Sequence, residues 1–472
     1  TNLWSVGANW FGGKVPGVND DVIFDSRNSV SCVVNVAATV KSLTIGAGYG
    51  GTITQNAALK VLGSFSQQSG TFRSGAATLD VDGDVALSGG SFTAPSRTFS
   101  VAGNFDQTGL GTFNHNNGTV VFDGVTNLRS AGNVFNNVQI GTPALGGRLT
   151  LLDNADFNGN FSVLNVTGAT LFDLGGKTLN FAGANLNLTN LDLFNSAGGT
   201  VIFDGVTGMR SAGKALGNVQ LGSATAGGRL TFLDNADIDG DFTVNEGGNT
   251  YLNVQNFSLN FSGAVLNFSG ADDGYAGSRH KIIFDRTTTA TELTLGGWEM
   301  GGIQIGSATS GGWLKLMDEG RFASNFSVGQ GGTTTFDLNG QNLNFQGDNG
   351  TVNFSGLDSF TGWTDSNAIK FYNKPGTTTY LRSGGVKIGG NFKNTCRGSL
   401  KLLDALNIEG NFYNGFGNAA FFDANGQAVT ISGSAWISNG IYYGRAGTQN
   451  FMTDLYIEGG TFTGATGAVN IG

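Results

Sequence analysis

Side chains that could act as acids, bases or nucleophiles are few in this chain. It contains two histidines, His115 in the segment FNHNNG and His280 in SRHKIIF, and neither stands in a recognisable pattern with a serine or cysteine nucleophile. Asp272 and Asp273 form a pair of neighbouring carboxylates, which could serve general acid–base catalysis. Their segment, SGADDGYAG, is more typical of a surface loop between repeats. The sequence therefore predicts no catalytic residue and no enzyme activity.

Two short segments place acidic residues at alternate positions, as calcium-binding loops do. They are DVDGD at 80–84 and DIDGD at 237–241, and calcium takes several oxygen ligands from such a segment. Equivalent positions elsewhere carry neutral residues, as in AGN at 102–104 and NGN at 158–160. Outward-facing strand positions explain that variation, so we predict neither a metal site nor a cofactor.

One aspartate recurs at a fixed place after a leucine-rich strand segment. A carboxylate at a fixed corner usually accepts backbone N–H hydrogen bonds and closes a turn, so we predict a structural role for it. The recurring positions are Asp153, Asp234, Asp318 and Asp404.

Composition limits the elements that could position these side chains. Glycine supplies 79 of the 472 residues, 12% are charged and only 4 are proline, which argues against a helix-rich enzyme and against collagen. With 39% hydrophobic residues and 36 phenylalanines, the chain can bury a core.

The net charge of −9, without a basic cluster, argues against nucleic-acid binding. No apolar run approaches the ~18 residues of a membrane span, so we expect no membrane insertion. Cys32 and Cys396 are far apart in the chain and are expected to stay unpaired.

Short strand-like segments recur in the first quarter of the chain. Each alternates apolar with other residues, as a strand does when it buries one face. A unit of about 20 residues with two or three such strands is one coil of a parallel β-solenoid, which becomes stable by stacking on its neighbours. The repeated segments are LKVLGSF at 59–65, LDVDGDV at 79–85 and FSVAGNF at 99–105, with Gly63, Gly83 and Gly103 spaced by 20.

A longer period covers the chain from residue 119 onward. Residues 119–142 return at 200–223 with an offset of 81 and 15 of 24 positions identical. The sequence predicts an all-β fold, a single elongated parallel β-solenoid with coils of about 20 residues and superrepeats of about 81. The usual crossover preference favours a right-handed coil, and stacking at about 4.8 Å per coil predicts a rod of roughly 110 Å. The predicted parts are an aromatic cap or entry segment at 1–40, 20-residue coils at 41–118, superrepeats at 119–198, 199–279, 280–368 and 369–447, and an uncapped coil at 448–472.

The repeats resemble those of a known group of proteins. The segment VAGNFDQTGLGTFNHNNGTVVFDG at 101–124, with NVQIG at 137–141, is similar to repeats of large secreted bacterial surface proteins with autotransporter-like or haemagglutinin-like parallel β-helices. The opening, Trp4 followed by ANWFGGKVPGVNDDVIF at 8–24, is similar to the start of many such proteins. The resemblance implies an extracellular or cell-surface protein, secreted with its leader removed, that serves adhesion or structure.

The two ends of the chain give the leading functional hypothesis. The last segment, TFTGATGAVNIG, is strand-like and uncharged, and the aromatic residues near the start could cover the first coil or pack against another subunit. An exposed coil that meets a complementary end forms a heterologous contact, which propagates into filaments. We therefore expect a homopolymer, assembled head to tail. The predicted contact residues are Trp4, Trp10, Phe11, Val469 and Ile471.

Two other functions are compatible with the sequence. An adhesin or glycan-binding stalk would bind cell-surface glycans through Trp298, Trp313 and Trp363, which break the repeat consensus. A polysaccharide lyase or hydrolase is the third reading, because β-helical enzymes such as pectate lyases use clustered aspartates with Arg, Lys or His. The Asn-Thr-Asp, Gly-His-Gly and Arg-Ile-Lys motifs of polygalacturonases are absent from the sequence, so this function is not expected.

Overall fold

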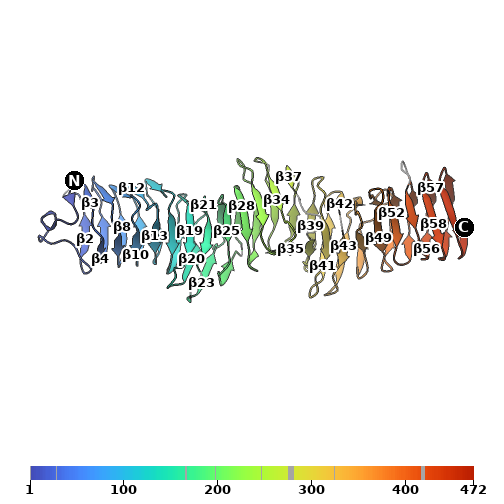
Figure 1. Cartoon of the computed structure of the whole chain (residues 1–472), viewed down its shortest axis with the longest axis horizontal. Helices are drawn as coiled ribbons and strands as arrows, with labels where there is room; N and C mark the ends of the chain where they lie inside the picture. The colour runs from blue at the N-terminus through green and yellow to red at the C-terminus, as the bar shows by residue number, and fades with distance from the viewer. Residues whose placement is uncertain are drawn as a thin grey trace. The chain divides into compact units, whose positions relative to one another are not determined.

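The computed structural model describes residues 1–472 except 1, 28, 165–166, 197, 246, 275–280, 324 and 416–419. The chain divides into two compact units, Thr1–Asp234 and Asn235–Gly472. In each unit, short strands follow one another around successive coils and pair in parallel with strands of the neighbouring coils (Figure 1). The all-β parallel β-solenoid predicted from the sequence is confirmed, and about 22 residues separate stacked strands. Among the described residues, the only helix is the single 3₁₀ turn η1 (Gly7–Asn9).

The first unit is built from parallel ladders, and each coil contributes one strand to three of them. Ladder A contains β1 (Asn2–Leu3), β3 (Cys32–Val34), β6 (Thr52–Gln55), β9 (Thr71–Ser74), β12 (Ser91–Thr93) and β15 (Thr112–Asn114). Ladder B contains β2 (Asp21–Phe24), β5 (Ser42–Ile45), β8 (Phe65–Gln67), β11 (Val85–Leu87), β14 (Phe105–Asp106), β17 (Val125–Arg129), β20 (Gly147–Leu151), β23 (Thr170–Asp173) and β26 (Leu193–Asn195).

Two further ladders and one short strand complete this unit. Ladder C contains β4 (Ala38–Val40), β7 (Leu59–Val61), β10 (Leu79–Val81), β13 (Thr98–Val101), β16 (Thr119–Phe122), β19 (Asn137–Ile140), β22 (Phe161–Val163), β25 (Asn185–Asn187), β28 (Val206–Arg210) and β31 (Arg229–Phe232). Ladder D replaces ladder A after β15 and contains β18 (Val134–Phe135), β21 (Ala155–Phe157), β24 (Thr178–Phe181), β27 (Thr200–Phe203) and β30 (Asn218–Leu221). The two-residue strand β29 (Ala215–Leu216) lies between β28 and β30 in the chain.

The second unit repeats the same construction. Ladder E contains β32 (Ala236–Ile238), β35 (Ser258–Phe261), β38 (Lys281–Phe284), β40 (Gly302–Ile305), β43 (Phe326–Val328), β46 (Thr351–Asn353), β49 (Thr378–Arg382), β52 (Ser399–Leu402), β55 (Phe421–Asp423), β58 (Ile441–Arg445) and β61 (Thr461–Ala465). Ladder F contains β42 (Gly320–Phe322), β45 (Leu343–Phe345), β48 (Ala368–Phe371), β51 (Asn391–Asn394), β54 (Phe412–Asn414), β57 (Ala435–Ser438) and β60 (Leu455–Glu458).

Its remaining strands form shorter ladders. Ladder G contains β50 (Lys387–Ile388), β53 (Leu406–Ile408), β56 (Val429–Ile431), β59 (Gln449–Phe451) and β62 (Val469–Ile471). Ladder H contains β33 (Phe242–Val244), β36 (Val265–Asn267), β39 (Thr291–Thr294), β41 (Gly312–Leu316), β44 (Thr334–Asp337) and β47 (Ser359–Thr361), and β34 (Tyr251–Asn253) pairs with β37 (Asp273–Gly274).

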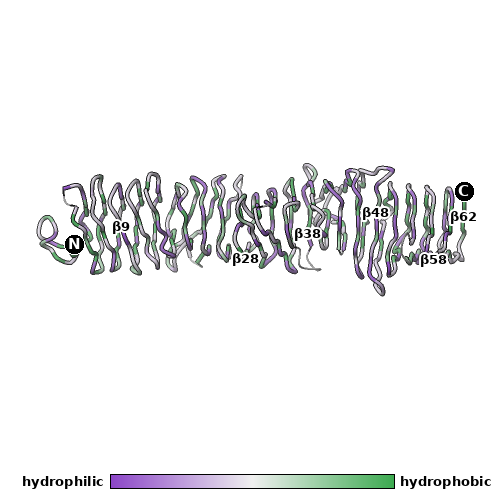
Figure 2. The backbone as a smooth tube through the Cα atoms, turned by 90° about the horizontal axis from the view of Figure 1, so that it is seen from above, coloured by the Kyte–Doolittle hydropathy of each residue, from purple (hydrophilic) through white to green (hydrophobic). Residues whose placement is uncertain are grey.

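The core consists of like side chains stacked from coil to coil. Leu59, Leu79 and Phe99 are in register on β7, β10 and β13, as the 20-residue period predicts, and all three are buried. Phe72 and Phe92 stack with ring centroids 5.2 Å apart and planes 10° apart. Figure 2 shows the resulting alternation of apolar and polar residues along the coils. Each inward side chain is covered by its equivalents in the neighbouring coils. The core is therefore a continuous stack, and its burial depends on every coil having neighbours.

The recurring aspartates close corners between coils, which confirms their predicted structural role. Asp153 accepts hydrogen bonds at 2.8 Å from the backbone N–H groups of Ser130 and Ala131, 22 to 23 residues earlier. Ala131 has a φ of 51°, a left-handed conformation that is costly for alanine, and the carboxylate holds it there. Asp234, Asp318 and Asp404 bind pairs of backbone N–H groups in the same way.

A second set of aspartates forms similar contacts that we did not predict. Each accepts the backbone N–H and the hydroxyl of a buried threonine one coil earlier, and the pairs are Asp192 with Thr170, Asp272 with Thr250, and Asp358 with Thr334. Asp272, which we considered as part of an acidic catalytic pair, therefore has a structural partner. The side chain of Asp273 lies outside the described ones.

Candidate binding surfaces: the terminal coils and two grooves

The first coil is covered by its own chain. Trp4 is fully buried, and Trp10 packs against it edge to face, with ring centroids 4.8 Å apart. The indole N–H of Trp10 donates a hydrogen bond of 2.8 Å to the Trp4 carbonyl, and Phe24 adds a third ring 5.7 Å from Trp10. Trp4 and Trp10, which we predicted as either a lid or a subunit contact, form a lid within the chain.

Phe11 has a different environment from the two tryptophans. It lies in the turn after Trp10 and is fully exposed, at 108% of its reference area. Exposure of a large aromatic side chain marks a surface available for contacts. Other exposed apolar residues of the first coils are Leu3, Val6, Val15, Val18 and Ile23.

The last coil has no comparable cover in the described structure. Ile457 and Ile471 stand in register with the buried residues Ile437 and Phe451, so they occupy inward positions of the ladders. They are nevertheless 50% and 60% exposed, and Val469 is 39% exposed. The apolar cross-section of the coil formed by β60, β61 and β62 is therefore accessible.

An outward row of aromatic residues leads to this coil. Tyr413, Trp436 and Tyr456 are in register on β54, β57 and β60 of ladder F. Their rings stack with centroids 4.9 and 5.2 Å apart and planes within 14°, and the Lys393 ammonium lies 5.3 Å from the Tyr413 ring centroid. We did not predict this row, although its members follow one another at one-coil spacing. Because stacked rings cover each other's faces, the ring of Tyr456, at 40% exposure, is the accessible end of the row.

The three tryptophans proposed for glycan contact differ from one another. Trp298 donates its indole N–H to the Ala271 carbonyl at 2.9 Å, and Trp363 donates to the Phe360 carbonyl at 3.0 Å. Both side chains are half-buried. Trp313 is 38% exposed and lines a groove of about 480 Å³. The groove is otherwise lined by Thr287, Thr309, Ser310, Gly311, Gly312, Gly331, Gly332, Thr333 and Thr335, with no charged residue among them.

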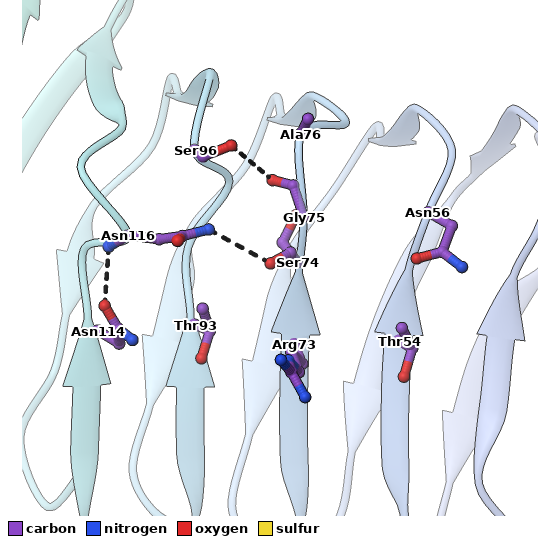
Figure 3. A pocket seen from close by; sticks show the side chains of 10 residues that line it. All are labelled: Thr54, Asn56, Arg73, Ser74, Gly75, Ala76, Thr93, Ser96, Asn114 and Asn116. Atoms are coloured by element: carbon purple, nitrogen blue, oxygen red, sulfur yellow. Dashed lines mark hydrogen bonds between the residues drawn. The ribbon is translucent and has the colours of Figure 1, made fainter.

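A second groove lies on the outward face of ladder A, in the first unit. It has a volume of about 670 Å³, and Figure 3 shows Arg73 at its middle with polar side chains on the neighbouring strands. Its lining residues are Thr54, Asn56, Arg73, Ser74, Gly75, Ala76, Thr93, Ser96, Asn114 and Asn116.

The acidic segments considered for calcium are engaged by the protein. The ammonium of Lys60 lies 2.6 Å from Asp80 and 2.7 Å from Asp82, and Asp84 accepts the Asn104 backbone N–H. In the second segment, Asp241 accepts two backbone N–H groups. Asp239 accepts the Ser262 hydroxyl and Asp237 the Asn260 amide, while burial raises the pKa of Asp237. Each carboxylate thus has a donor from its own chain.

The remaining candidate residues have structural surroundings. The Nδ1 atom of His115 accepts the Asn117 backbone N–H at 3.0 Å within a turn, whereas His280 lies outside the described residues. In the part of the chain that the structure covers, no group of three or more His, Cys, Asp or Glu side chains is arranged to hold a metal. Cys32 and Cys396 are unpaired and buried. Burial raises the pKa of Cys32 to about 11 and that of Cys396 further still, so neither is a reactive thiolate.

Comparison of the chain with family models, curated proteins and solved structures found no match. Within the described residues, no helix is long and apolar enough to span a membrane. Among the described residues, the terminal coils and the two grooves offer surfaces for binding.

Proposed function

We propose that the protein is an extracellular structural protein that assembles head to tail into a filament through its terminal coils. The observation that carries the proposal is the exposure of apolar inward residues on the last described coil, where Ile457, Val469 and Ile471 keep 39% to 60% of their area accessible. The partner is a second copy of this chain.

The direction of assembly follows from the pairing of the strands. β60, β61 and β62 each pair on one side only, and so do β1, β2 and β4 in the first coils. All named strand pairs are parallel, so one free edge is complementary to the free edge at the other end and continues the same hydrogen-bond pattern. Such a contact is heterologous and does not close, which favours an open filament over a dimer.

Apolar burial would stabilise this contact modestly for each residue. Covering the accessible parts of the three last-coil side chains contributes on the order of 1 kcal/mol each, and covering Phe11 contributes about 2 kcal/mol. The hydrogen bonds of newly paired strands add to this. Because Trp10 already covers the core of the first coil, Phe11 and the neighbouring apolar residues, rather than Trp4, would meet the incoming coil.

The decisive experiment compares assembly at rising protein concentration. In sedimentation velocity and negative-stain electron microscopy, the unsubstituted chain should form filaments with one chain per axial repeat. Changing Val469→Asp together with Ile471→Asp places two charges in the contact and should leave monomers.

The matched control changes two valines that are more exposed than Val469 and Ile471 but lie on strands inside the ladders. Val125 and Val206, on β17 and β28, are 67% and 70% exposed, and Val125→Asp with Val206→Asp should leave assembly unchanged. A native chain that stays monomeric at high concentration contradicts the proposal, and so does equal loss of assembly in both double variants.

We also propose that the protein is extracellular and belongs to the secreted bacterial surface proteins. This rests on the resemblance of the repeats and on the low share of charged residues, 12%. Antibody labelling of intact source cells and of their medium tests the location. Signal found only after the cells are broken open would contradict it.

The groove at Trp313 supports a second function, binding of neutral glycans. A partly exposed tryptophan between glycines offers a ring face for a pyranose, and the surrounding threonine and serine hydroxyls offer hydrogen bonds. In a glycan array, Trp313→Ala should abolish binding and Trp313→Phe should preserve it in part. Retention of binding by Trp313→Ala would remove the assignment.

A further inference from the structure

The floor of the Arg73 groove is a regular row of polar side chains. Thr54, Arg73, Thr93 and Asn114 are in register on β6, β9, β12 and β15, and Figure 3 shows the four side by side on adjacent strands. Parallel strands lie about 4.8 Å apart. The row therefore offers one hydrogen-bonding group per strand with a guanidinium in its second place.

The rim of the groove is held in place by the protein itself. Asn116 adopts a φ of 50° in the turn after β15, where its side-chain amide donates to the Ala94 carbonyl at 3.1 Å and to that of Ser74 at 3.4 Å. The Ser96 hydroxyl donates to the Gly75 carbonyl at 3.3 Å. A rim fixed before a ligand arrives reduces the ordering cost of binding.

Buried hydrogen bonds also fix the strand that carries Arg73. The Ser74 hydroxyl, in the next position along β9, donates to the Gln55 side-chain oxygen at 2.7 Å, and both residues are buried. The amide of Gln55 donates to the Thr78 carbonyl at 2.7 Å. The strand positions beneath the groove are thus held by a satisfied polar network, which favours a single backbone geometry.

Within the described part of the chain, no carboxylate pairs with Arg73. None of the ten lining residues is acidic, and no ion pair to Arg73 occurs among the described residues. By contrast, Lys60, Arg321 and Arg445 each face a carboxylate. In a chain with 34 acidic and 25 basic residues, a guanidinium alone in a polar groove is available for an external anion.

We propose that this groove binds an acidic sugar chain through a carboxylate held by Arg73. Guanidinium and carboxylate form paired, charge-assisted hydrogen bonds. Thr54 on one side, and Thr93 and Asn114 on the other, hydrogen-bond hydroxyl groups of the flanking sugar rings. The strand spacing is close to the distance between successive rings in an extended pyranose chain, and the groove volume is in the usual range for ligand sites. This site is independent of the filament contacts.

Net charge makes the proposal specific. Because its net charge is −9, the chain as a whole repels polyanions, so non-specific attraction cannot produce binding of an acidic sugar. Binding must then come from a local site, and removal of one positive charge at that site should have a large effect.

The test uses isothermal titration of the full chain with a hexamer of mannuronic acid and with its methyl ester, which keeps the sugar chain and removes the charge. The native chain should bind the acid, and the ester at least tenfold more weakly. Arg73→Gln should weaken binding of the acid at least tenfold.

Arg97→Gln is the matched control, because Arg97 is also exposed and near ladder A but does not line the groove. It should change the affinity less than twofold, whereas Thr93→Val, which keeps side-chain shape and removes a hydroxyl, should weaken binding several-fold. Failure of the native chain to bind the acid overturns the proposal. Equal affinity for acid and ester, or equal losses in Arg73→Gln and Arg97→Gln, overturns it as well.

Discussion

The first and last coils of the described chain carry the same kind of inward apolar residues but differ in what covers them. At the first coil, Val22 and Val40 are 3% and 0% exposed, and residues between β1 and β2 fold back and place Trp10 against Trp4. At the last coil, Val469 and Ile471 occupy equivalent inward positions and are 39% and 60% exposed. Ladder pairing alone therefore does not shield a coil's core. Either a segment that leaves the coil path or another coil has to do so.

The lid is held by polar contacts as well as by rings. The side-chain amide of Asn9 donates to the Leu3 carbonyl at 2.9 Å, and Gly13 donates its backbone N–H to the Trp10 carbonyl at 3.0 Å. The segment thus forms its own small structure on the coil, whereas β60 to β62 rely on in-register stacking with the coil before them.

The largest expected difference between the two ends is in stability. Trp4→Ala removes a fully buried indole and should destabilise the first coils by about 3–5 kcal/mol, while Ile471→Ala should cost only about 1 kcal/mol because most of that side chain is already exposed. Hydrogen exchange of the β3–β5 and β56–β59 amides measures the two effects separately, which matters because a solenoid need not unfold in one step. Equal losses at both ends would remove the distinction between a covered and an open coil.

A second, smaller effect is expected when the lid is loosened without removing Trp4. Trp10→Ala loses an edge-to-face ring contact and a hydrogen bond, about 1–3 kcal/mol together. Local opening of β1 should then raise the rate at which a thiol reagent labels Cys32 about tenfold or more. Cys396, in the second unit, serves as the internal reference and should keep its rate. Unchanged labelling of Cys32 would show that the lid does not protect the first coil.

The last coils should also be sensitive to acid. Burial opposes ionisation of Asp423, but hydrogen bonds from Arg445 on β58 outweigh it, so the pKa of Asp423 is lowered overall. A lowered folded-state pKa stabilises the fold above the ordinary value near 4, and the stabilisation is lost as pH falls through the folded-state pKa. Asp423→Asn should lower the exchange protection of β58 several-fold at pH 7, and the gap should narrow below about pH 4.

Asp21 provides the comparison at the first coil. It pairs with Lys41, and both side chains are at least half exposed, so screening by water makes the pair weak. Asp21→Asn should leave the exchange of β2 nearly unchanged. A large effect of Asp21→Asn would mean that exposed ion pairs, rather than the lid, stabilise the first coil.

The smallest expected effect is that of Phe11→Ser. Because this ring is fully exposed, its loss should change the stability of the isolated chain by less than about 0.5 kcal/mol. Filament formation should nevertheless weaken, since the ring belongs to the proposed contact surface. A stability loss as large as that of Trp10→Ala, measured by thiol labelling of Cys32, would place Phe11 within the lid instead.

Much of the architecture could be predicted because equivalent residues recur at regular intervals along the sequence. The 20-residue offset of Leu59, Leu79 and Phe99 gave their register directly, and the 81-residue offset of Asp153 and Asp234 predicted a shared corner role. Stacking couples each residue to its equivalent one coil away, so sequence periodicity and spatial proximity coincide in this fold.

The parts that could not be predicted depend on segments without a repeat. Trp4 and Trp10 fit a lid and a subunit contact equally well in the sequence, and only the path of the segment after β1 decides between them. The outward row ending at Tyr456 follows at spacings of 23 and 20 residues, but its three rings are not part of a repeated motif that would have marked them. The register of the Arg73 row could be predicted, since Thr54, Arg73 and Thr93 follow at intervals of 19 and 20 residues. Only the structure shows that no carboxylate among the described residues pairs with Arg73.

The carboxylate corners have a mechanical consequence. They recur along the chain about every 40 residues, at Asp153, Asp192, Asp234, Asp272, Asp318, Asp358 and Asp404, and each ties a coil to the one before it. Under tension a solenoid unwinds from an end, one coil after another, and each tie has to rupture before the coils behind it come free. The force–extension curve of a single molecule should therefore show a sawtooth pattern. Each force peak marks the rupture of one tie and should release roughly 130–165 Å of chain. Before residue 119, Asp84 accepts one backbone N–H group of the neighbouring coil rather than a pair, so the force peaks there should be smaller.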